Sequence, residues 1–363
     1  MNTGNQPDRR NRKFADVPLP KRDKLLTNRG TPSPKNLGPL EQLLGAWTAD
    51  GTGWNMIALP FQNAPTAPAG FKFRLLMNQY NEELRFTFVD DDVPNRGLLR
   101  AGDPDHDQFV VTLDYQQRIA QIAADDRPAS PDAGAAGLPI HHEPGLWLYD
   151  KNRRATDDQI VGDQVSEVVL DVARLASIPH GNSVLALGRS ERHDGMPDIP
   201  PLSGLPSGRF EDVNTPAYDF KTDPYLEPYN HYINSPFKGT LAAVSSFPGF
   251  SPADMNELLR FANQGLNIVR TTTLTVDSTR KNAGIRNAPF SVREAEAVSM
   301  KSTFWIQEVE EAGKLRLRLQ YSQVVMLNFF RPREDELPGV AAWPHISIAT
   351  LEKMPANYTL LDV

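Results

Sequence analysis

Two groups of histidines are the residues best suited to chemistry in this 363-residue sequence. His345 opens the stretch 345–351, which reads His-Ile-Ser-Ile-Ala-Thr-Leu, and His141 is followed directly by His142 and Glu143. Neutral imidazole is the commonest metal ligand among side chains, and it also exchanges protons near neutral pH. The sequence therefore makes His345 a candidate metal ligand, and His141 a candidate metal ligand or acid–base residue.

The surroundings of His345 favour a fixed ligand on a strand. Pro344 restricts the backbone at this step, so a strand that begins here holds its first side chain in a defined place. Strict alternation places Ile346 and Ile348 opposite His345, although branched apolar residues usually point inward. An inward His345 is compatible with buried Ile346 and Ile348 if Pro344 breaks the alternation at a barrel mouth, or if both faces of the strand are covered. A hydrogen-bonded structural histidine is the alternative.

The other histidines leave several interpretations open. The His141-His142-Glu143 cluster could instead stabilise a turn before a strand. Together with His180 it could also supply nitrogen and oxygen ligands to zinc. The acidic run 90–92 is typical of a solvated turn rather than of a calcium site.

Composition excludes several classes of protein. The net charge of -7 and the pI of about 5.6 argue against nucleic acid as the main partner, because phosphate contacts need a basic face. Without cysteine there can be no disulfides, iron–sulfur clusters, thiolate-ligated heme or cysteine nucleophiles. No apolar run approaches a membrane span and the N-terminus lacks a secretory signal, so we expect a cytoplasmic protein without a membrane partner. The oligomeric state stays open.

Short strands dominate the expected secondary structure, because 31 prolines and 24 glycines interrupt the chain. A short helix is expected at 39–44 and a longer one at 251–265, capped by Ser251. Alternating or β-rich segments indicate an antiparallel barrel or sandwich, and a barrel of this kind can hold one small ligand. The segments are 53–59, 71–77, 83–89, 108–115, 146–148, 165–178, 183–187, 267–276, 295–309, 315–330 and 345–351.

The chain divides into a polar arm and one large domain. Residues 1–36 are basic-leaning without a periodic apolar face, so we expect a flexible arm. Residues 37–363 form a single domain with an insertion at about 189–265. Its first part, 189–238, is too long for a structureless connection and is expected to lie over a mouth or rim, or to form a lid.

Three segments, in chain order, resemble the nitrobindin family of heme-binding β-barrels, which are related to fatty-acid-binding proteins. Residues 43–53 read Leu-Leu-Gly-Ala-Trp-Thr-Ala-Asp-Gly-Thr-Gly and are similar to the family's opening motif, with Ala49 where glycine is usual. Residues 139–147 are similar to its Pro-Met-His-x-Glu-x-Gly motif. Residues 345–351 resemble the C-terminal motif that carries the proximal heme ligand.

The resemblance implies a calycin-like, mainly β barrel of about ten strands that binds heme b. It makes His345 the iron ligand and places Trp47, Gly51, Gly53, His141 and Ser347 at the cofactor. His141 would face the bound ligand as a catalytic residue or hold a heme propionate. The implied activity is nitric oxide binding and peroxynitrite isomerisation to nitrate, with at most weak peroxidase activity. His180 follows its proline where the family has histidine before it, so no role is carried over.

Two other functions remain open from the residues alone. The barrel could be a heme-free carrier of a small apolar ligand, with a structural His345. The chain could also be a protein-interaction domain that docks a partner through the 1–36 arm and the 189–238 segment.

Overall fold

A computed structural model describes the ranges 37–60, 73–96, 107–130, 133–151, 155–161, 164–178, 181–209, 223–289, 296–328 and 340–356. The chain divides into two units, Met1–Pro34 and Lys35–Val363. The first unit, and with it the predicted arm, lies outside the described residues. His180 lies outside them as well. The following description concerns the second unit.

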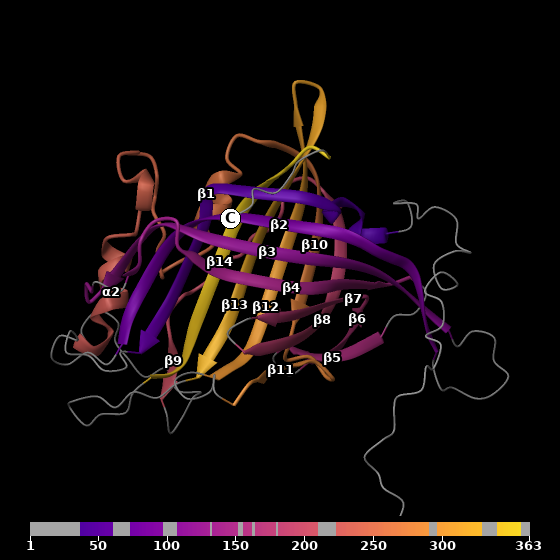
Figure 1. Cartoon of the computed structure of the whole chain (residues 1–363), viewed down its shortest axis with the longest axis horizontal. Coiled ribbons are helices and arrows are strands. Elements are labelled where there is room, and N and C mark those ends of the chain that lie inside the picture. Colours follow the sequence, from indigo (N-terminus) through magenta and orange to yellow (C-terminus); the bar gives the residue numbers. More distant parts are fainter. Residues whose placement is uncertain are drawn as a thin grey trace, which may run out of the picture. The chain divides into compact units, whose positions relative to one another are not determined.

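Ten antiparallel strands close into a barrel (Figure 1). Each strand pairs with the next in order, and the first strand also pairs with the last, which closes the ring. The strands are β1 (Gly45–Pro60), β2 (Phe73–Arg96), β3 (Asp107–Arg127), β4 (Pro139–Asp150), β7 (Val172–Ile178), β8 (Asn182–Asp194), β10 (Asn267–Asp277), β12 (Glu296–Glu311), β13 (Lys314–Asn328) and β14 (Val340–Lys353). The calycin-like barrel prediction is confirmed, and the sandwich alternative is wrong.

Smaller elements decorate this ring. Strands β5 (Ala155–Val161) and β6 (Gln164–Leu170) form a separate hairpin, β9 (Ser207–Arg209) extends the sheet beside β14, and β11 (Gly284–Asn287) pairs with β8. The 3-10 helices are η2 (Gly38–Leu43), η4 (Pro224–Leu226) and η5 (Gly239–Leu241). The predicted helix at 39–44 corresponds to η2, and the two predicted strands 71–77 and 83–89 are one long strand, β2.

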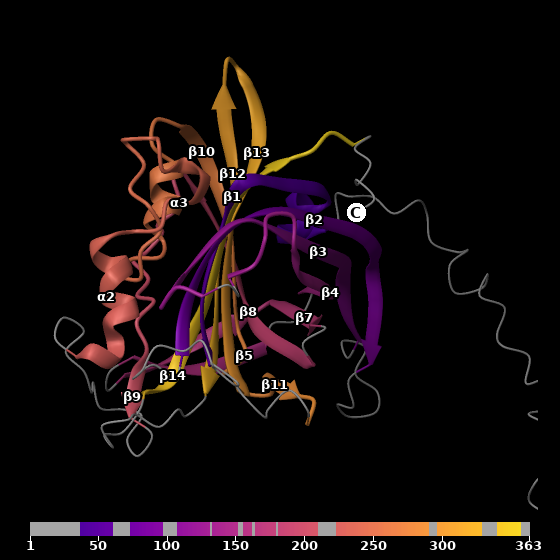
Figure 2. The ribbon, with the colours of Figure 1, turned by 60° about the vertical axis from the view of Figure 1, so that its left-hand side comes forward.

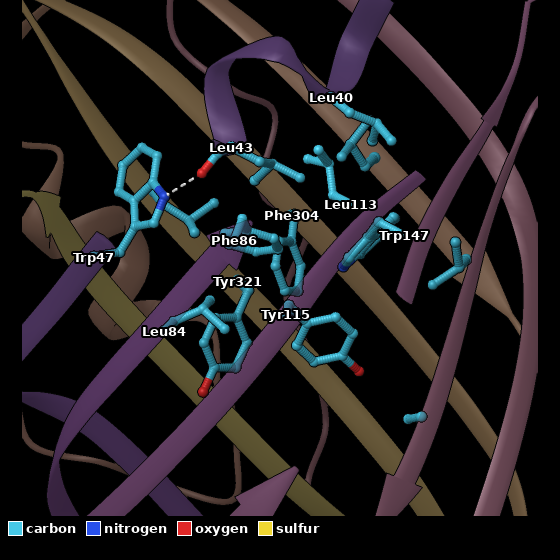
Figure 3. Close-up of a cluster of buried hydrophobic side chains, with 14 of the residues drawn as sticks. Leu40, Leu43, Trp47, Leu84, Phe86, Leu113, Tyr115, Trp147, Phe304 and Tyr321 are labelled. Atoms are coloured by element: carbon cyan, nitrogen blue, oxygen red, sulfur yellow. Dashed lines mark hydrogen bonds between the residues drawn. The ribbon is translucent and has the colours of Figure 1, made fainter. Parts of the chain in front are cut away.

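Alternate residues of the strands fill the barrel with a first hydrophobic core (Figure 3). The rings of Phe86, Tyr115, Trp147, Phe304 and Tyr321 dominate it, and each is at least nine-tenths buried. Phe304 stacks on Tyr321 with ring centroids 5.3 Å apart and lies 5.3 Å from Trp147. The interior is therefore filled mainly by side chains.

A second core lies on the outer face of the barrel. The chain between β8 and β10 carries α2 (Glu227–Asn234) and α3 (Glu257–Ala262), which lie against the outside of the sheet in Figure 2. This outer layer packs on outward side chains of β1, β2, β12 and β14; Trp54, for example, stacks on Phe247 at 5.4 Å. The prediction of a mouth cover or lid is therefore wrong for the described part of the insertion.

The helices of this layer differ from the predicted one. Helix α3 occupies only Glu257–Ala262 of the expected 251–265, because residues 251–256 make separate turns and Asn256 takes the N-cap position. Met255, Leu258 and Leu259 of this segment are buried. Helix α2 was not predicted. Within the described ranges, every helix is too short or too polar to traverse a lipid bilayer.

Candidate functional site: a polar layer across the barrel

His345 lies on the inner face of β14. Ala349 and Leu351 on the same face belong to the interior core, whereas Ile346 and Ile348 are fully buried against the outer layer. Both faces of the strand are thus covered, which reconciles an inward imidazole with outward isoleucines. Trp343, two residues before His345, also belongs to the outer cluster, so the alternation breaks at Pro344 and both alternatives drawn from the sequence apply.

Asn55 of β1 holds His345 in place. Its Nδ2 lies 2.7 Å from His345 Nε2 and 2.8 Å from Ser347 Oγ, and Asn55 and Ser347 are register partners. Asn55 therefore occupies the position beside Nε2 that a metal ion would have to take.

His141 lies on β4 beside a buried carboxylate. Its Nε2 lies 3.2 Å from Glu143 Oε2. The other oxygen, Oε1, accepts hydrogen bonds from Tyr115 and, at 2.6 Å, from Arg174. Burial alone would raise the pKa of Glu143, but the Arg174 charge and the hydrogen bond to His141 outweigh it and lower the pKa to about 2. An ionised carboxylate thus orients the imidazole of His141.

Arg174 is the centre of the layer and is only 2% exposed. Besides Glu143, it donates to Tyr115 Oη at 2.9 Å, Ser302 Oγ at 3.2 Å and Gln323 Oε1 at 2.7 Å. Its guanidinium also lies 5.2 Å from the Tyr115 ring centroid. Gln323 is in turn the register partner of Ser347 on the neighbouring strand.

These contacts define what we call the polar layer. It runs from one wall of the barrel to the other and consists of His141, Glu143, Tyr115, Arg174, Ser302, Gln323, Ser347, Asn55 and His345. Strands β4 and β14 run in the same direction, because six antiparallel steps separate them in the ring. Both predicted histidines thus belong to the polar layer, His345 on the first half of β14 and His141 near the start of β4, where it lines a groove with Thr48 and Ala49 of β1.

A second buried acid, Glu82, lies on the inner face of β2 and is 1% exposed. Tyr321 Oη donates to its Oε2 at 2.7 Å and Gln117 Nε2 donates to its Oε1 at 2.6 Å, while Tyr80 Oη lies 2.9 Å from Tyr321 Oη. Burial raises the pKa of Glu82 to about 7 against the opposing effect of these donors. The carboxyl therefore changes protonation near neutral pH.

Other predicted site residues lie apart from His345. Trp47 is buried near the start of β1, opposite Lys353 at the end of β14, and donates from Nε1 to Leu43 O at 2.7 Å (Figure 3). This is the opposite end of the barrel from His345. Gly51, at φ +66°, lies in a bulge of β1 and donates from its amide to Asn81 Oδ1 at 2.7 Å.

Gly53 lies beneath the Tyr80 ring, where a Cβ would collide with ring carbons.

The described part of the chain contains no group of three or more histidine, cysteine, aspartate or glutamate side chains that could hold a metal ion. His142 is exposed on the opposite face of β4 from His141. The zinc hypothesis on His141, His142 and Glu143 therefore gains no support from the described residues.

Sequence reasoning missed the central arginine and the second acid as site residues. Arg174 alternates in phase with Val172 and Ala176, and Glu82 alternates in phase with Leu84, so their inward direction could have been read from the pattern. Arg318, which alternates with leucine in 315–319, is buried although such a pattern is typical of one solvated face: it is 5% exposed and donates to Ala262 O at the end of α3.

The spaces near the site differ greatly in size. An enclosed cavity of about 30 Å³, lined by Glu143, Gln323, Val325 and apolar neighbours, lies beside the polar layer. A cavity of this size holds about one water molecule. A larger, open groove of about 710 Å³ crosses β1 to β4 and is lined by backbone and side chains that include Ile119, Ala120 and His141.

Heme b is the group that the sequence resemblance implies, and the described residues fit it in one respect. The donor type is suitable, because His345 presents an imidazole to the interior of the barrel. The enclosed space is not, because about 30 Å³ cannot hold a macrocycle. A heme on His345 would have to displace Asn55 and lie outward of the polar layer, toward the end where β14 begins. We therefore derive no chemical step through heme.

Comparisons with known proteins give little further information. No protein-family model matches the chain, and no curated protein matches it. A solved structure with a similar fold is described as "Crystal Structure of Rv2717c from M. tuberculosis". It is 14% identical to this chain with a TM-score of 0.33, and the match covers 88% of this chain and 98% of the other. A likeness this distant carries no argument about function.

Proposed function

We propose that the barrel binds heme b through His345 and acts on nitrogen oxides, binding nitric oxide and isomerising peroxynitrite to nitrate. The observation that carries this proposal is the inward imidazole of His345 on a strand whose outer face is covered. The three sequence segments that resemble nitrobindins supply the identity of the ligand. A heme with one imidazole ligand keeps its sixth position open for a diatomic gas or a peroxide-type anion.

The polar layer supports a limited role for protein groups in such chemistry. His141 lies on the inner face of β4, and Glu143 orients its ring, so His141 is the group suited to hold or move a proton. Efficient peroxidases also need an arginine that is free to help break the O–O bond. Arg174 is committed to Glu143, Tyr115 and Gln323. We therefore expect weak peroxidase turnover at most.

Hemin titration followed by absorbance tests the proposal. Wild type should show a saturable Soret shift, and His345→Ala should lose it. His193→Ala is the matched control, because His193 is exposed on β8. This variant should bind hemin like wild type. If His345→Ala binds hemin as wild type does while His141→Ala does not, the ligand is His141 and the assignment of His345 is wrong.

A heme-free carrier of a small apolar molecule is the second candidate. The observation in its favour is the groove of about 710 Å³ across β1 to β4, which falls in the usual size range of ligand sites. If wild type takes up no hemin, a naphthalene-based fluorescent dye should bind this groove. Ala120→Trp should then block the dye by filling the groove, and undiminished dye binding by that variant would exclude the groove as the site.

A further inference from the structure

A second cleft, of about 510 Å³, lies at the end of the barrel opposite His345. It is formed by η2 and by the strand ends of β8, β10, β13 and β14. Strands β8 and β14 end there, and β13 and β10 begin there, which sets it apart from the polar layer. Its walls include Pro39, Gln42, Arg192, Thr272, Leu317 and Lys353.

Lys353 is a partly buried cation in this cleft that lacks an acidic partner among the described residues. Its Nζ donates to Gln42 O at 2.6 Å and lies 4.6 Å from the ring centroid of Trp47. The neighbouring acid Glu352 pairs instead with Arg316 and Arg318. An ammonium has three donors, so contacts with one carbonyl and one ring face leave capacity for a further acceptor.

Two other charges of the cleft already have partners. Arg192 pairs with Glu308 at 3.0 Å, and Glu191 pairs with Arg189 at 3.0 Å. Glu308 also accepts from Gln42 Nε2 at 2.6 Å, which holds the residue whose carbonyl receives Lys353. Exposed Glu41 and Glu191 on the lining would repel a second negative charge on a ligand.

We propose that this cleft binds a small molecule with a single carboxylate and an apolar body, with the carboxylate paired to Lys353. Pro39 and Leu317 supply apolar wall for the body of the ligand, and Thr272 supplies a hydroxyl. The proposal is independent of heme, because the cleft and His345 lie at opposite ends of the barrel.

Proton linkage makes the proposal measurable. Burial lowers the pKa of Lys353 to about 8, so the side chain is mostly neutral at pH 8.5. An anion bound beside it favours the charged form. Binding at pH 8.5 should therefore take up part of a proton from the buffer, and binding at pH 6.5 should take up less.

The experiment is calorimetric titration with 2-naphthoate in buffers of different ionisation enthalpy. We expect binding with the proton uptake given above, about tenfold weaker binding by Lys353→Met, and retained binding by Lys353→Arg. Lys301→Met is the matched control, because Lys301 is exposed on β12. This variant should bind 2-naphthoate like wild type. The neutral 2-naphthamide and the dianionic 2-naphthyl phosphate should bind more weakly.

Equal binding of 2-naphthamide, or full affinity in Lys353→Met, would overturn the proposal. Absence of proton uptake by wild type at pH 8.5 would overturn it as well, and this result does not depend on whether any variant folds. Tighter binding of 2-naphthyl phosphate than of 2-naphthoate would assign the cleft to phosphate ligands instead and contradict the stated ligand class.

Discussion

Replacing Arg174 with methionine tests whether the polar layer holds the barrel together. The variant keeps the length of the side chain but leaves Glu143, which is 1% exposed, without its cationic partner. The pKa of Glu143 is lowered from 4.5 to about 2, and this difference corresponds to about 3 kcal/mol of stabilisation of the charged carboxylate. Breaking one side of a buried pair typically costs about 3–5 kcal/mol. We expect Arg174→Met to lose that much unfolding free energy at pH 7.

The pH dependence has a definite sign. A carboxyl with a lowered pKa contributes stability that is complete above about pH 4.5 and is lost as the pH falls toward 2. The difference between wild type and Arg174→Met should therefore be largest at neutral pH and shrink at pH 3. Urea denaturation at both pH values measures it. Arg189→Met is the matched control, because its pair with Glu191 is half exposed on both sides and should matter little.

A double variant separates the charge from the packing. Arg174→Met with Glu143→Leu removes both charges and should recover a large part of the stability lost by Arg174→Met alone, because no unpaired charge stays buried. A loss below about 1 kcal/mol in Arg174→Met, or a double variant as unstable as the sum of the two single variants, would refute this reasoning.

Three further changes have expected outcomes. The pKa of Glu82 is raised to about 7, so wild type should lose unfolding free energy as the pH rises from about 4.5 to 7. Glu82→Gln should remove this pH dependence and melt at a higher temperature than wild type at pH 8. A melting temperature of Glu82→Gln that follows wild type from pH 4 to 8 would contradict this prediction. Gly53→Ala should cost about 1–3 kcal/mol in urea denaturation by collision with the Tyr80 ring, and Tyr80→Leu in the same chain should relieve part of the loss. Leu259→Ala, buried in the outer layer, should cost about 2–5 kcal/mol, whereas exposed Val244→Ala should be nearly neutral in the same assay.

Much of the fold follows from local pattern. Within the expected strand 108–115, Val111, Leu113 and Tyr115 do alternate toward the core, whereas the expected strand 165–178 is two strands, β6 and β7, in different sheets. Closure of the ring is a long-range property, because β1 must meet β14 across the whole domain, and no local pattern encodes it. The break expected in β2 was wrong because Asn78, Tyr80 and Glu82 continue the alternation with polar and aromatic groups.

The outer layer explains the remaining failures. Where both faces of a strand are covered, alternation of apolar and polar residues no longer identifies the interior. Ile346 and Ile348 therefore left the face of His345 open, and the alternating pattern around Arg318 does not show that α3 lies over it. The layer itself has little periodicity, because its aromatic residues, such as Tyr225 and Phe250, pack from turns rather than from long helices.

Chemical rescue of the missing imidazole tests the central proposal most directly. His345→Gly should bind hemin without the wild-type Soret spectrum, and added free imidazole should restore that spectrum by replacing the lost ligand. His142→Gly, changed on the exposed face of β4, should need no imidazole. A wild-type spectrum from His345→Gly in the absence of imidazole would contradict the assignment of His345 as the heme ligand.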